Sequence, residues 1–118
     1  MTDDHAPESL GPGELVEVAD GVHAWLQQDG SWWINNAGVV VGDAAAVLID
    51  TCTTERRTRE LLDEVAQVSH DKPLRYAVNT HHHGDHTFGN SLLPPHTVLI
   101  GHRAMREALL ADRTLEAF

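Results

Sequence analysis

The strongest chemical signal in the sequence comes from four residues in one short segment. They are His81, His83, Asp85 and His86, within Asn79-Thr80-His81-His82-His83-Gly84-Asp85-His86. Side chains two apart in extended backbone point to the same side, so His81 and His83 can converge while His82 points elsewhere. Gly84 permits a tight change of direction that brings Asp85 and His86 round to the same cavity. Two neutral imidazoles suit a borderline cation such as Zn²⁺, and a carboxylate suits a second such ion nearby.

The alternative interpretation is a solvated histidine loop that binds metal adventitiously. Three consecutive histidines alone would leave the two interpretations about equal. A specific metal site is favoured by three neighbouring features: the Asp85-His86 pair, the preceding Asn79-Thr80 and the following Phe88-Gly89-Asn90.

The elements around this segment can be predicted from residue spacing. Residues 74–78 read as a short buried strand, so the histidines follow its carboxyl end, where open α/β sheets bind their ligands. Thr53 or Thr54 can cap a helix that ends at residues 71–73. Its apolar positions recur at helical spacing: Leu61, Leu62, Val65 and Val68. Another strand is expected over residues 97–100 and a second helix over residues 103–115.

The first part of the chain predicts a β-meander. Strands are expected over residues 15–18 and 22–26 around the turn pair Asp20-Gly21, then over 32–41 and 46–49. A meander followed by strand, helix, strand and helix predicts an α/β layer with helices on one sheet face. Residues 1–13 are expected to form a flexible lead-in, and residues 14–118 the folded unit.

Composition limits the classes of function. The chain has 118 residues, 42% of them hydrophobic, which fits one globular domain. A net charge of −10 disfavours nucleic acid as a partner. No apolar stretch approaches the roughly 20 residues of a membrane span, and no secretory signal is seen, so a cytoplasmic protein is expected. The single cysteine, Cys52, excludes an intramolecular disulfide and is expected to be buried.

The pattern His-x-His-x-Asp-His resembles the signature of the metallo-β-lactamase superfamily. Asn35-Ala37-Gly38 with residues 39–41 resembles the second-strand region of that family, and residues 47–51 resemble its strand ending in Asp-Thr. Asn79-Thr80 and Gly89-Asn90 bracket the motif as they commonly do in the family. The resemblance extends over about residues 18–110.

The resemblance implies roles for individual residues. His81 and His83 would be two of the three histidines of a first metal site, and Asp85 and His86 two ligands of a second. Asp50 would hold the motif loop by hydrogen bonds and not by metal contact. The simpler alternative for Asp50 is a turn residue after a strand. For His102, a helix cap or a wall residue is favoured, with metal ligation as the weaker alternative.

The resemblance also implies a fold and a chemistry. The family fold is an αββα sandwich of two similar halves, and these residues match the N-terminal half. One sheet face would then be uncovered, exposing Val, Ile and Trp side chains, and the missing ligands would come from a second half, chain or subunit. The implied enzyme is a hydrolase with one or two Zn²⁺ ions, Fe or Mn being alternatives. A metal-bound hydroxide would attack an ester, thioester or lactam carbonyl, and Asp85 would orient it or carry a proton.

Trp32 and Trp33 lie in a loop that often overhangs the metal site in this family. They predict a small-molecule substrate with an apolar or aromatic part, with packing in the core as the alternative. Residues 30–38 also resemble the metallo-β-lactamase-like polyketide cyclases, which makes a cyclase or thioesterase an alternative function. A non-catalytic metal-binding module is the third.

Overall fold

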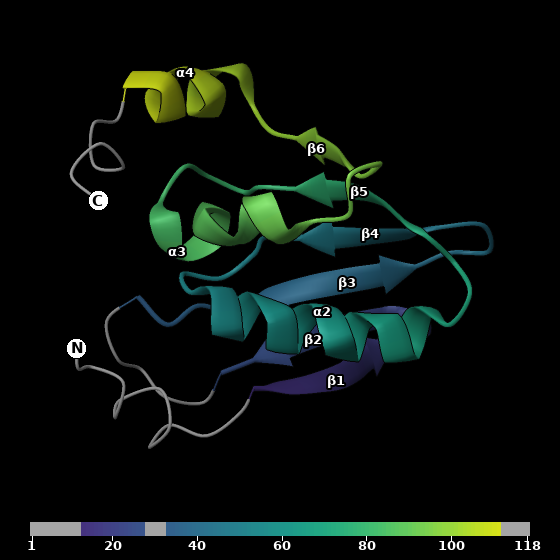
Figure 1. Cartoon of the computed structure of the whole chain (residues 1–118). Coiled ribbons are helices and arrows are strands. Elements are labelled where there is room, and N and C mark those ends of the chain that lie inside the picture. The colour runs from purple at the N-terminus through teal and green to yellow at the C-terminus, as the bar shows by residue number, and fades with distance from the viewer. Residues whose placement is uncertain (1–12, 28–32, 112–118) are drawn as a thin grey trace.

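The computed structural model describes residues 13–27 and 33–111, so nearly all of the predicted lead-in lies outside the described residues. Six strands form one sheet whose spatial order follows the chain (Figure 1). The elements are β1 (Glu14–Ala19), β2 (Val22–Leu26), β3 (Ala37–Val41), β4 (Ala46–Ile49), α2 (Glu55–Ser69), β5 (Leu74–Val78), α3 (Gly84–Thr87), η2 (Phe88–Leu92), β6 (Val98–Ile100) and α4 (Arg103–Ala111).

The predicted meander is present, since β1 to β4 pair antiparallel. The third strand, however, is shorter than predicted and begins only at Ala37. The backbone before it is held by side chains and not by a strand partner: Asn35 Nδ2 donates to the Thr51 carbonyl at 2.8 Å. Asn36 Oδ1 accepts from the Gln27 amide at 2.9 Å. Residue 32, the predicted start of that strand, lies outside the described residues.

Helix α2 covers one face of the sheet (Figure 1). Thr54 caps it, its side chain accepting from the Arg57 amide, as one of the two threonines was predicted to do. Leu61 and Val65 are buried at 0% and 3% exposure. They pack with Trp25, Val39, Ala46, Leu48, Cys52 and Ala77. Burying each large aliphatic side chain contributes roughly 1.5–3 kcal/mol, so this contact fixes the helix over the sheet.

The other face of the sheet carries a continuous row of apolar side chains. Val40 pairs with Val47, Val47 with Tyr76 and Tyr76 with Val98, and paired residues share a face. Tyr76 is 39% exposed, Val98 51% and Ile100 44%. Within residues 13–27 and 33–111, no element covers these valine and isoleucine side chains, as predicted from the sequence. Tryptophan was expected on this face as well, but Trp25 is 1% exposed and packs in the core.

Two further predictions need correction or restriction. Strand β5 was expected to be buried, but Arg75 and Tyr76 are exposed and only Ala77 is fully buried. Helix α4 ends at Ala111 within the described residues, and the rest of the predicted range 103–115 lies outside them. Among the described helices, none is both long and apolar enough to cross a membrane.

Substitution of Gly89 by alanine should destabilise the fold. A Cβ at this position would lie 2.1 Å from Thr58 Oγ1 and 2.8 Å from Thr58 Cβ, so η2 could not keep its distance from α2. Overpacking of this kind costs about 1–3 kcal/mol, which urea denaturation would measure as a lower unfolding free energy. In the control, Gly101→Ala, the new Cβ meets the flexible Met105 sulfur, and the change should be small. Equal stability of Gly89→Ala and Gly101→Ala would contradict the packing described here.

Candidate metal centre

Strands β4 and β5 run parallel and end side by side, which places two polar segments at the same edge of the sheet. Asp50 directly follows β4, and its amide donates to the Val78 carbonyl at the end of β5 at 2.8 Å. Residues 80–86, here called the motif loop, begin two residues after the end of β5. Asp50 has a left-handed φ of 70°, a conformation that aspartate tolerates better than most residues.

The structure brings His81, Asp85 and His86 together. One possible ligand atom from each lies within 4.8 Å of the other two. His86 Nε2 is 3.5 Å from Asp85 Oδ2, and the ring centroids of His81 and His86 are 4.2 Å apart. Ligands at zinc distances in a tetrahedral site are about 3.3–3.5 Å from each other, so small side-chain movements would complete the set. The donor types and their spacing therefore fit a zinc-like ion.

His83 is placed less directly. Its ring lies 4.9 Å from that of His81, yet the residue is exposed and does not belong to the converging group. His82 lies on its other side, with the two rings 4.7 Å apart. The structure thus brings together His81, one of the two ligands predicted for the first site, and Asp85 and His86, the two predicted for the second.

The buried carboxylate of Asp50 orients the loop. Its Oδ1 accepts from the Thr80 amide at 2.8 Å, and its Oδ2 accepts from the Thr80 hydroxyl at 2.8 Å. Oδ2 also lies 2.7 Å from His86 Nδ1. An ionised carboxylate can only accept, so His86 carries a proton on Nδ1, and Nε2, the nitrogen nearer Asp85, is the one that could bind a metal. A carboxylate behind a histidine ligand is a frequent feature of metal sites.

Gly84 is needed for a reason other than the expected change of direction. It is the first residue of the short helix α3, and its φ is not in the left-handed region. A Cβ at this position would lie 2.3 Å from the ring of Phe88. Phe88 packs against Trp33, with ring centroids 5.6 Å apart. Glycine at position 84 therefore leaves room for the Trp33–Phe88 pair to pack against the motif loop.

Asn79 and Asn90, which bracket the motif in the sequence, bond to each other and hold the loop in place. Asn90 Nδ2 donates to Asn79 Oδ1 at 2.7 Å, and Asn79 Nδ2 donates back to Asn90 Oδ1 at 3.2 Å. The Thr51 amide donates to the His86 carbonyl at 2.9 Å. Both asparagines flank the histidines in the sequence, but only the fold shows that they bond to each other.

The local environment affects protonation of His81. Its burial, followed by the charges of His86 and His83, lowers the pKa of His81 below its ordinary value. The ring is therefore neutral at pH 7, the form in which histidine binds a metal.

The remaining candidate residues do not belong to the group formed by His81, Asp85 and His86. His102 Nδ1 accepts from the Ala104 amide at 2.9 Å and caps the start of α4. The carbonyl of Trp33 accepts from the Thr53 hydroxyl at 2.7 Å, which fixes the end of its loop near Phe88. Trp32 lies outside the described residues.

Cys52 should resist thiol reagents in the folded chain. Its side chain is fully buried, and this burial raises the pKa of the thiol to about 12 from 9.0. Because the thiolate is the reactive form, iodoacetamide should label Cys52 only after unfolding, as mass spectrometry would show. The folded state holds the proton more tightly, so stability should fall as pH rises from about 9 toward 12. Rapid labelling under native conditions would contradict this burial.

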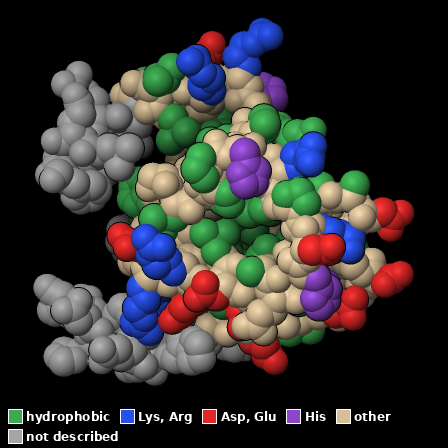
Figure 2. All heavy atoms as spheres, turned by 45° about the vertical axis from the view of Figure 1, so that its right-hand side comes forward, with side chains coloured by type: hydrophobic (Ala, Val, Ile, Leu, Met, Phe, Trp, Pro, Cys, Tyr) green, Lys and Arg blue, Asp and Glu red, His purple; other side chains and the backbone are tan. Residues whose placement is uncertain are grey.

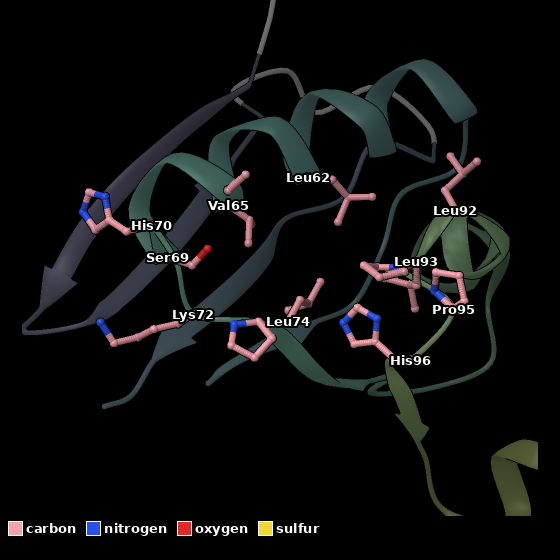
Figure 3. Close-up of a pocket in the computed structure, with 13 residues that line it drawn as sticks. Leu62, Val65, Ser69, His70, Lys72, Leu74, Leu92, Leu93, Pro95 and His96 are labelled. Atoms are coloured by element: carbon pink, nitrogen blue, oxygen red, sulfur yellow. The ribbon is translucent and has the colours of Figure 1, made fainter. Parts of the chain in front are cut away.

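A hollow of about 470 Å³ lies away from the motif, between the second half of α2 and residues 92–96. Figure 2 shows apolar side chains gathered in this part of the surface. Leu62, Val65, Leu74 and Leu93 line it, with His96 at its edge (Figure 3). It contains no residue of the motif loop and lies near the amino end of β5, whereas the candidate centre lies beyond the carboxyl end.

The comparisons with known proteins agree with this geometry. The family model described as the metallo-beta-lactamase superfamily matches residues 30–114. A solved metallo-beta-lactamase from Erythrobacter litoralis is 27% identical, with a TM-score of 0.69, over 86% of this chain and 46% of that one. FIM-1 from Pseudomonas aeruginosa, solved in a mono-zinc form, is 23% identical, with a TM-score of 0.66. The match covers 85% of this chain and 46% of FIM-1. The metallo-beta-lactamase from Hirschia baltica is 21% identical, with a TM-score of 0.66. The match covers 85% of this chain and 48% of that one.

The chain thus spans about half the length of these solved structures. The likeness to the two structures under 25% identity concerns the fold alone. No curated protein matches the chain.

Proposed function

Because the chain belongs to the metallo-beta-lactamase superfamily, we propose that it supplies the metal-binding half of a metal-dependent hydrolase. The observation that carries the proposal is the convergence of His81, Asp85 and His86 within 4.8 Å at the carboxyl edge of the sheet. The mono-zinc form of FIM-1, a structure with the same fold, makes zinc the first metal to test.

His81, His83, Asp85 and His86 are the residues that would hold the metal, as one or two Zn²⁺ ions, with Fe or Mn as alternatives. A bound ion would supply a water whose pKa is lowered toward roughly 7, and a positive charge for a developing oxyanion. His86 is already oriented by Asp50 with Nε2 turned toward the centre. Asp85 lies beside that nitrogen, where its carboxylate can orient a nucleophile or take up a proton.

The substrate class follows from the same arrangement. Such a centre suits attack on a carbonyl, and we propose an ester, thioester or lactam as the bond that is cleaved. Trp33 and Phe88 form an aromatic pair next to the motif loop. Their position supports a substrate with an apolar or aromatic part, which aromatic side chains bind well.

The uncovered sheet face supports a further part of the proposal. Val40, Tyr76 and Val98 are each more than a third exposed on that face. Contiguous apolar surfaces of this kind mark interfaces. We propose that a second layer, from another segment or chain, covers this face and brings the remaining metal ligands.

The test is zinc-dependent hydrolysis by the chain on an aryl ester, a thioester and a β-lactam. Zinc held by His81, Asp85 and His86 should already give turnover above that of free zinc, abolished by a chelator, before the second layer adds its ligands. Asp85→Asn should lower the rate by about 10²- to 10⁴-fold if Asp85 transfers a proton. The control is Asp43→Asn, because Asp43 is an exposed acid of a distant turn. Zinc binding with no turnover on any of the substrates would refute hydrolysis by this chain and favour a metal-binding module.

A further inference from the structure

Thr80 connects Asp50 to a second histidine of the centre. Its hydroxyl donates to Asp50 Oδ2 at 2.8 Å, and the same oxygen lies 2.9 Å from His81 Nδ1. The backbone amide of Thr80 is held by Asp50 Oδ1 at 2.8 Å, so the residue has two attachments to one carboxylate.

The direction of the Thr80–His81 bond follows from counting protons. A hydroxyl has one proton, and that of Thr80 is directed to Asp50, which can only accept. The bond to His81 therefore needs its proton from the imidazole. His81 must carry hydrogen on Nδ1, which leaves the lone pair on Nε2.

We infer that Thr80 is a positioning residue that fixes the tautomer and ring orientation of His81 so that Nε2 is available to the metal. This inference rests on the proposed function of the centre. Asp50 then determines the tautomers of two histidines, that of His86 directly and that of His81 through the Thr80 hydroxyl. Such outer partners typically affect metal affinity by 10- to 100-fold.

The first experiment reads the tautomer without any metal. Long-range ¹H–¹⁵N correlation spectra of the chain, recorded at about pH 8 where histidine is neutral, distinguish the two nitrogens of each ring. His81 should show a protonated Nδ1 in the unmodified chain. In Thr80→Val the acceptor is lost and the Nε2-protonated form should become populated, whereas Thr80→Ser should retain the original spectrum.

The second experiment measures zinc affinity by competition with a chromophoric chelator. Thr80→Val should bind zinc about 10- to 100-fold more weakly, and Thr80→Ser within a few-fold of the unmodified chain. Denaturation of all three forms would show whether Thr80→Val is folded, and the spectrum of the unmodified chain tests the inference even if it is not.

The outcomes separate this inference from the proposed function. A protonated Nε2 on His81 in the unmodified chain would overturn the inference, as would a Thr80→Val variant with unchanged tautomer and affinity. Equal losses in the valine and serine variants would also overturn it, because serine keeps the hydroxyl. Failure of the unmodified chain to bind zinc would refute the proposed function, while the spectra would still decide the tautomer.

Discussion

Asp50→Asn should lower the zinc affinity of the chain by about 10- to 100-fold while leaving the fold intact. Asparagine has the same shape and tolerates the left-handed φ of 70° found at this position. Its oxygen can still accept from the Thr80 amide, so its NH₂ group would then face the Thr80 hydroxyl and His86 Nδ1. Two N–H groups cannot bond to each other, and His86 would move its proton to Nε2, the nitrogen near Asp85.

The control for this prediction is Asp43→Asn. Asp43 is exposed in the turn between β3 and β4, so the control removes the same charge away from the centre. A chelator competition assay would compare the two variants with the unmodified chain. If Asp50→Asn and Asp43→Asn bound zinc equally well, Asp50 would have no orienting role and would be only a turn residue after β4.

Charged residues on the uncovered sheet face should convert an associating chain into a monomer. Tyr76 and Val98 are adjacent on that face and 39% and 51% exposed. Exposed apolar surface drives association, so the chain should elute as larger species in size-exclusion chromatography and bind a hydrophobic dye. The double variant Tyr76→Lys with Val98→Lys should elute as a monomer and bind much less dye.

A matched pair of lysines tests whether added charge alone is responsible. Ala66→Lys with Gln67→Lys places the same charge on the exposed side of α2, and these substitutions should leave association unchanged. Monomeric behaviour of the unmodified chain, without dye binding, would contradict the view that this face needs a covering layer.

Much of this architecture could be predicted because it depends on local patterns. The spacing of Leu61 and Val65 together with a threonine cap predicted α2, and the turn at Asp20-Gly21 predicted the first hairpin. Residues Leu74–Val78, predicted as a short strand just before the motif, do form strand β5. Parallel pairing of β4 with β5 then brings Asp50 beside the motif loop, as the resemblance implied.

The errors arose where contacts between distant residues decide the local structure. The third strand was predicted from its apolar and aromatic residues, but Asn35 bonds to Thr51 and keeps the preceding backbone out of the sheet. Gly84 appeared to be a turn glycine, yet the ring of Phe88 is what excludes a side chain there. The Asn79–Asn90 pair forms only once η2 has folded back onto the end of β5. No periodicity in a single sequence reports such contacts.

The most direct test of the central claim is the zinc content of the chain after equilibrium dialysis at a fixed free zinc concentration. Mass spectrometry would compare the unmodified chain with His86→Ala and with His96→Ala, a histidine outside the motif loop. We expect bound zinc in the unmodified chain and in His96→Ala, and its loss in His86→Ala. No bound zinc in the unmodified chain, or equal zinc in all three, would contradict a metal centre built on His81, Asp85 and His86.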